Sequence, residues 1–218
     1  MRKLAKSLHR MQRAKSEQLK RGYAAVFPKG GTSYVDQEDT TFSYEDGDVI
    51  WASFGLVLIA PATNKNAYPA SSGALGIFYL TELNGKFVVR KSWPATIGGS
   101  IMGEPPERET SAKFGDMPVV ISKAADFWQG IACHHTSVVG LYPDVGPRPL
   151  ASFHSFYDNG GAEQNPTKIQ AIERTIENVI AGQSFDVRFD GTMRFVAHYR
   201  KNGDRYARTD NGADIPTC

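Results

Sequence analysis

The chain has 218 residues, and its 41% hydrophobic content is enough to bury a core of ordinary domain size. Its two cysteines, Cys133 and Cys218, exclude the multi-disulfide framework of small secreted domains, although one bridge between them stays open. The net charge of +2 conceals an asymmetry: residues 1–21 contain eight basic residues and one acidic residue, a net charge of +7, which leaves −5 for the rest. Such a division predicts a separate role for the N-terminus.

Residues 2–21 are predicted to form a basic amphipathic helix. Its apolar stripe consists of Leu4, Leu8, Met11 and Leu19, which fall within a sector of about 80° on a helical wheel, with Lys15 among them. The opposite face is basic and contains Arg2, Lys6, Arg10, Arg13 and Lys20. Gly22 is expected to end the helix, because glycine is common just after the last helical turn.

The apolar stripe indicates what this helix binds. A helix that contacts only phosphates does not need apolar side chains in register, so docking on a protein or on an anionic surface is favoured. The residues expected to make that contact are Arg2, Leu4, Lys6, Leu8, Arg10, Met11, Arg13, Leu19 and Lys20. The alternative is that the helix packs on its own domain and leaves its basic face in solvent.

The sequence divides into a helical arm at residues 1–22, a linker and acidic segment at 23–48, and a β-rich domain at 49–218. Residues 36–48 include six acidic residues and no basic one, and an autoinhibitory or purely structural pairing of this segment with the basic helix is one alternative for its role. The run Glu104–Glu109 is predicted to be a solvated loop.

The 21 glycines and 12 prolines, together with 9 tyrosines and 12 phenylalanines, favour a turn-rich β fold. Asn84-Gly85, Asp190-Gly191 and Asn202-Gly203 each separate strand-like segments, as hairpin turns do. Further predicted strands are 49–59, 118–122, 127–133, 136–142 and 150–156. The predicted fold is therefore mainly β, an antiparallel β-sandwich or partly open barrel with the N-terminal helix and one further helix.

The further helix is predicted at Lys168–Ala181. Ile169, Ile172, Ile176 and Ile180 recur there at helical spacing, and Gly182 follows as a stop. A strand is the alternative for this segment.

Residues 128–135 form the segment with most potential for chemistry. Cys133 is a candidate nucleophile with His135 or His154 as its base, and Cys133, His135 and His198 are candidate zinc ligands. Neighbouring residues of a strand point to opposite faces, so His134 and His135 would not share one metal. No recognised catalytic or metal-binding spacing accompanies them, and a buried cysteine with hydrogen-bonded histidines is the favoured interpretation; no cofactor is predicted.

The sequence thus favours a non-enzymatic structural or interaction protein that docks on a larger assembly, such as a virus or phage particle, through its N-terminal helix. A metal- or cysteine-dependent hydrolase using Cys133, His135 and His154 is one alternative, and a nucleic-acid-binding protein is another. The expected partner is a protein assembly or a second copy of the chain, with an anionic membrane or nucleic acid as alternatives. Neither a signal peptide nor a membrane-spanning run is evident, so a cytoplasmic or particle-associated location is expected.

Overall fold

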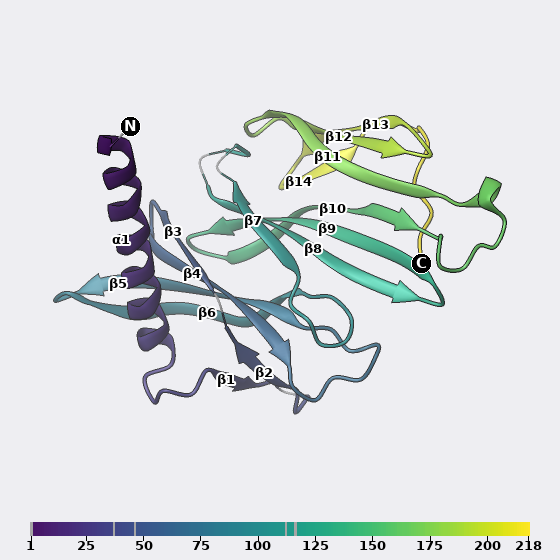
Figure 1. Ribbon diagram of the computed structural model, residues 1–218. Coiled ribbons are helices and arrows are strands. Elements are labelled where there is room, and N and C mark those ends of the chain that lie inside the picture. The colour runs from purple at the N-terminus through teal and green to yellow at the C-terminus, as the bar shows by residue number, and fades with distance from the viewer. Residues whose placement is uncertain (1, 37, 46, 112, 116) are drawn as a thin grey trace. The chain divides into compact units, whose positions relative to one another are not determined.

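The computed structural model describes the backbone of all residues except 1, 37, 46, 112 and 116, and the side chains of its described residues from Ala14 onward (Figure 1). The fold is mainly β with antiparallel sheets and an N-terminal helix, as predicted. The chain divides into two compact units, unit 1 with residues 1–98 and 102–105 and unit 2 with residues 99–101 and 106–218. The division near Gly98 falls inside the segment expected to be one β-rich domain.

Unit 1 contains helix α1, Arg2–Val26, and an antiparallel sheet in the order β1-β2-β4-β5-β6, with β3 paired to β4. The strands are β1 Ser33–Val35, β2 Thr41–Tyr44, β3 Asp48–Ala52, β4 Gly55–Asn64, β5 Ala74–Leu83 and β6 Lys86–Gly98. Asn84 and Gly85 turn β5 into β6 with positive φ angles of 51° and 75°, which confirms the hairpin predicted from this dipeptide.

Two predicted strands contain turns that the sequence did not indicate. Residues 49–59 are not one strand, because the chain turns between β3 and β4 and Gly55 there adopts a φ of 133°. Residues 127–133 are divided in the same way by Gln129 and Gly130, whose φ angles are 48° and 83°. Gln-Gly thus forms the turn that Asn-Gly forms elsewhere in the chain.

The last turns of α1 pack on the sheet of unit 1, next to β3, β4 and β6 (Figure 1). Leu19, Tyr23 and Val26 contact an apolar cluster formed by the buried side chains of the sheet, which include Leu58 and Leu80. The contact is apolar burial of one helix face, the usual source of helix stability in proteins.

Ion pairs flank this apolar contact. The Lys15 ammonium lies 2.7 Å from an Asp48 carboxylate oxygen, so the basic residue within the predicted apolar stripe is paired with the acidic segment. On the other side Arg21 lies 2.6 Å from Glu82, and its guanidinium is 4.4 Å from the ring centre of Phe87. The alternative in which the acidic segment pairs with the helix is therefore observed at one ion pair, Lys15 with Asp48.

Gly22 does not end the helix, contrary to the prediction. The helix continues to Val26, where the Phe27 N–H still donates to the Tyr23 carbonyl at 2.8 Å and Pro28 prevents a further turn. Gly22 instead lies where the helix meets the sheet, and a Cβ atom there would be 3.4 Å from Leu80 and 3.9 Å from Val49. The missing side chain allows a close approach rather than a left-handed cap.

Unit 2 is an eight-stranded antiparallel sheet in which each strand pairs with its neighbours in sequence, in the order β14 through β7. Its strands are β7 Glu107–Ser111, β8 Val119–Trp128, β9 Ile131–Tyr142, β10 Gly146–Asp158, β11 Ala171–Ile180, β12 Ser184–Gly191, β13 Phe195–Asn202 and β14 Arg205–Arg208. Its core includes Phe153, Ile172, Phe185 and Tyr199. The predicted turn at Asn202-Gly203 joins β13 to β14, and Gly203 has a φ of 60°.

The helix predicted at Lys168–Ala181 is wrong. The segment forms a short 3₁₀ turn, η1, at Pro166–Lys168, and then strand β11 between β10 and β12. Ile172, Ile176 and Ile180 are four residues apart, and a spacing of four fits both a helix face and a strand face. The β-branched side chains prefer the strand, and Ile172 is fully buried in the sheet's core.

The close approach at Gly22 gives a first prediction. Gly22→Ala should stabilise the protein by about 0.5–1 kcal/mol, because alanine favours the helix and its methyl group fits the available space. Gly22→Leu should destabilise it by about 1–3 kcal/mol through overpacking. Urea unfolding measures both, with Ala24→Leu on the exposed side of the helix as the matched control. Equal stability of Gly22→Leu and Ala24→Leu would contradict this packing.

Candidate functional site

A β-bulge in β10 gives the two neighbouring histidines of β9 different cross-strand partners. Consecutive residues of β9 face opposite sides, and His135 pairs with His154 whereas His134 pairs with Phe156. Ser155 is the extra residue of the bulge, and its hydroxyl donates to the His134 carbonyl at 3.2 Å. Because one residue is inserted, His154 and Phe156 lie on opposite faces of the sheet instead of sharing one.

His135, His154 and Ser152 form one cluster on these two strands. The His135 Nε2 atom hydrogen-bonds the Ser152 hydroxyl, and the His135 and His154 ring centres are 5.3 Å apart. Burial, followed by the neighbouring His154, lowers the pKa of His135. A neutral imidazole next to a hydroxyl resembles a base and nucleophile pair. The structure therefore brings together the two predicted base candidates, with a serine that the sequence analysis did not select.

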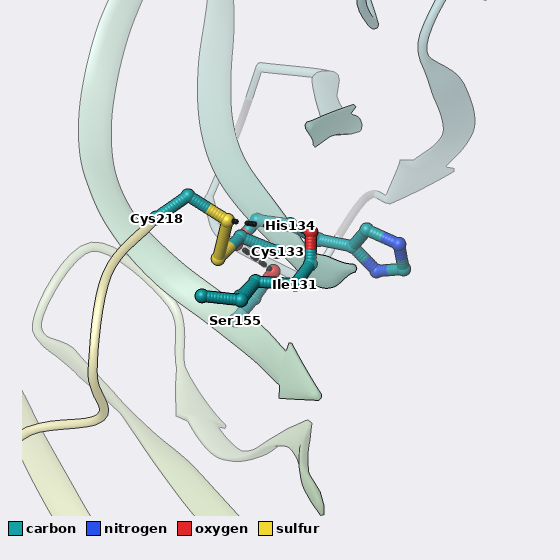
Figure 2. The surroundings of a disulfide bond; sticks show 5 residues. All are labelled: Ile131, Cys133, His134, Ser155 and Cys218. Atoms are coloured by element: carbon teal, nitrogen blue, oxygen red, sulfur yellow. Dashed lines mark hydrogen bonds between the residues drawn. A yellow bond between two sulfur atoms is a disulfide. The ribbon is translucent and has the colours of Figure 1, made fainter. Parts of the chain in front are cut away.

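Cys133 is bonded to Cys218 in a disulfide with a Cα–Cα distance of 6.0 Å (Figure 2). Figure 2 shows the His134 ring pointing away from the two sulfur atoms. A disulfide sulfur offers no thiolate, so in this form Cys133 is neither the nucleophile nor the zinc ligand considered from the sequence. The bond fixes the C-terminal tail to β9 at Cys133, which is a buried member of the apolar core of unit 2.

His198 occupies a different part of the sheet, on β13, separated from β10 by β11 and β12. Its Nδ1 atom lies 2.8 Å from Asp186 of β12. Although burial opposes it, hydrogen bonds from His198 and Asn178 hold the pKa of Asp186 below its ordinary value. In the part of the chain that the structure describes, no group of three or more His, Cys, Asp or Glu side chains is placed to hold a metal ion.

A pocket of about 390 Å³ opens on unit 2 where β11 leaves β10. The ladder between β10 and β11 has only three residue pairs, whereas β10 and β9 share eleven, so the two strands separate beyond Phe156 and Glu173. The volume is in the range of small-molecule sites. The pocket is lined by Glu107, Arg108, Glu109, Ile121, Lys123, His134, Ser155, Phe156, Glu173 and Arg174.

The charged groups of this pocket differ in their exposure to solvent. Glu107, Glu109 and Glu173 are exposed, whereas Lys123 and Arg174 are partly buried. The Lys123 ammonium lies 2.7 Å from Glu107. Burial lowers the pKa of Arg174, and Glu109 and Glu107 act in the opposite direction.

His134 and Phe156 form the aromatic wall of the pocket. Their rings stack with centres 4.5 Å apart and an interplanar angle of 22°. Burial and then the nearby Lys123 lower the pKa of His134, so its ring is neutral near pH 7. A neutral histidine stacked on phenylalanine presents a flat surface with little charge.

The predicted partner-binding residues lie on α1. Leu19 packs against the sheet of unit 1 and Lys20 is exposed. The side chains of Arg2, Leu4, Lys6, Leu8, Arg10, Met11 and Arg13 lie outside the described residues, although the backbone there is helical. The apolar stripe thus makes contact within unit 1 at its C-terminal end.

Sequence reasoning missed the residues of the pocket. Glu107 and Glu109 belong to the run Glu104–Glu109, predicted to be a solvated loop, of which residues 107–109 instead lie in β7. Lys123 lies in β8, and Glu173 and Arg174 are neighbours in β11; these three charged residues belong to no recognised motif. Along β11 the sequence AIERTIENVI shows no alternation of charged and apolar residues, so no pattern indicated that Glu173 and Arg174 line a pocket.

Comparisons of the chain with protein-family models, with curated proteins and with solved structures find no match. Within the described residues, no helix has the length and apolar character needed to cross a membrane. Function is therefore inferred from the residues of this chain alone.

The disulfide gives a second prediction. Reduction should lower the unfolding free energy of unit 2 by about 2–4 kcal/mol, because the bond closes a long loop with a sequence separation of 85. The measurement is urea unfolding with and without dithiothreitol. A Cys133→Ala/Cys218→Ala double variant is the control, and the reductant should leave it unchanged. Two reactive thiols in the native protein, purified without reductant, would refute the pairing.

Proposed function

We propose that the protein is a non-enzymatic structural protein that joins a larger assembly, such as a virus or phage particle, through α1. The observation that supports this is the fixed position of the helix's last turns on unit 1. A helix of 25 residues is about 37 Å long, and residues 2–13 account for about 18 Å of it. Because the C-terminal end of α1 is anchored on unit 1, the turns formed by residues 2–13 extend from a folded unit and are available to bind a partner.

The way α1 binds its own sheet suggests what else it binds. Leu19 of the stripe packs on apolar side chains, while Lys15 and Arg21 reach carboxylates on either side. The sequence pattern continues through Leu4, Leu8 and Met11 with basic residues beside them. A surface that fits these turns is apolar and bordered by carboxylates.

A second copy of the chain is the partner that this chemistry favours. Residues 1–21 have a net charge of +7 and the rest of the chain −5, so the arm of one copy complements the body of another. Burying three apolar side chains yields about 1.5–3 kcal/mol each before the costs of association. The contact is then reversible, as expected for subunits that assemble from solution.

The disulfide supports a location for this assembly. Disulfides persist on particles and in oxidising compartments and are rare in the reducing cytosol. Of the two expected locations, the Cys133–Cys218 bond favours the particle-associated one.

Light scattering after size-exclusion chromatography tests the proposal on the full chain. The wild type should elute as species larger than the 23.9 kDa monomer, with a mass that rises with concentration. Two triple variants should be monomers. The first, Leu4→Ser/Leu8→Ser/Met11→Ser, removes the apolar side chains of the proposed contact, and the second, Lys6→Gln/Arg10→Gln/Arg13→Gln, removes its positive charges. Lys65→Gln/Lys86→Gln/Arg90→Gln, three exposed basic residues of unit 1, is the control and should assemble normally.

Three results would overturn the proposal. A wild type that stays monomeric at every concentration removes the second copy as partner. Binding to anionic vesicles that the leucine variant loses would make α1 a membrane anchor. Nucleic-acid binding that falls steeply with salt and disappears in the glutamine variant would favour the nucleic-acid alternative.

A further inference from the structure

The pocket of unit 2 combines a cation at depth with carboxylates at its edge. Arg174 is partly buried, while Glu109 and Glu173 are exposed. A ligand that enters this pocket meets negative charge first and positive charge further in. Such an order favours a molecule with both signs of charge.

Arg174 is the group that marks the inner end. Among the described residues, no carboxylate lies within 4.0 Å of its guanidinium, whereas Lys123 in the same pocket is paired with Glu107. A partly buried guanidinium loses hydration and gains most from an added anion. Its planar donors match a carboxylate in two parallel hydrogen bonds.

The wall between the two ends is apolar. Phe156 faces the pocket because the bulge at Ser155 turns it away from His154 and onto the side of His134. The stacked His134 and Phe156 rings offer a surface for the carbon atoms of a ligand.

We propose that this pocket binds a small zwitterion of the α-amino-acid class, with its carboxylate on Arg174 and its ammonium group toward Glu173 and Glu109. The three glutamates and the three basic residues of the lining balance, so the site has no net charge that would favour a dianion such as phosphate. A volume of about 390 Å³ holds an amino acid or a dipeptide. The site belongs to unit 2 and is independent of docking through α1.

A thermal-shift screen of the full chain against the twenty L-amino acids tests this site, with acetate and ethylamine as probes of one charge each. At ligand concentrations about tenfold above Kd, the Tm should rise by about 3–5 °C for at least one amino acid. Acetate and ethylamine at the same concentration should leave it unchanged. Isothermal calorimetry then gives the Kd of the responding amino acid.

Matched variants decide whether the pocket is responsible. Arg174→Gln should weaken binding at least tenfold, and Arg194→Gln, an exposed arginine of the same unit, should not. Glu173→Gln, on the exposed edge, should weaken binding of the amino acid and is a second readout if Arg174→Gln unfolds. No response to any amino acid, an equal response to acetate, or an unchanged Kd in both pocket variants would overturn the proposal.

Discussion

The last turns of α1 are held on the sheet of unit 1 by an apolar contact that requires a small residue at position 22. Gly22 has no side chain, so the helix lies close enough for Leu19 and Tyr23 to reach the buried cluster of the sheet. Lys15 and Arg21 then meet Asp48 and Glu82 at the edges of the contact. Isolated basic helices are marginal in water, so this packing converts a charged segment into a fixed element of unit 1.

In unit 2, two local irregularities of an otherwise regular antiparallel sheet determine where the histidine cluster and the pocket lie. One inserted residue, Ser155, places Phe156 beside His134 and His154 beside His135, on opposite faces of the sheet. The early departure of β11 from β10 opens a pocket next to Phe156. A perfectly regular sheet would have placed His154 and Phe156 on one face and left no such pocket.

Much of the architecture was predictable from local patterns. The charge asymmetry and the apolar stripe predicted the helix, and Asn84-Gly85 predicted a hairpin because two positive φ angles suit that dipeptide. The helix prediction at Lys168–Ala181 was wrong because it was based on the spacing of residues such as Ile172 and Ile176. Residues four positions apart lie on one face in a helix and also in a strand. The prediction that Gly22 ends the helix was wrong for a related reason. The sequence does not distinguish a glycine that ends a helix from a glycine that allows a helix to pack closely on a sheet.

The candidate sites were less predictable, because they depend on pairings between distant segments. The bond between Cys133 and Cys218 joins residues 85 positions apart, and sequence left it open. Ser152 and His135 meet only through the register of β9 and β10. The pocket collects charges from separate strands, β7, β8 and β11, and no spacing in the sequence relates them.

Hydrogen exchange of the backbone amides of α1, followed by mass spectrometry, measures most directly whether the helix is fixed on unit 1. Residues 17–26 should exchange as slowly as the buried strands β4 and β5, and Gly22→Leu should remove this protection while β4 and β5 keep theirs. Rapid exchange of residues 17–26 in the wild type would show that the helix is not docked, and would contradict the anchoring of α1 on which the proposed assembly depends.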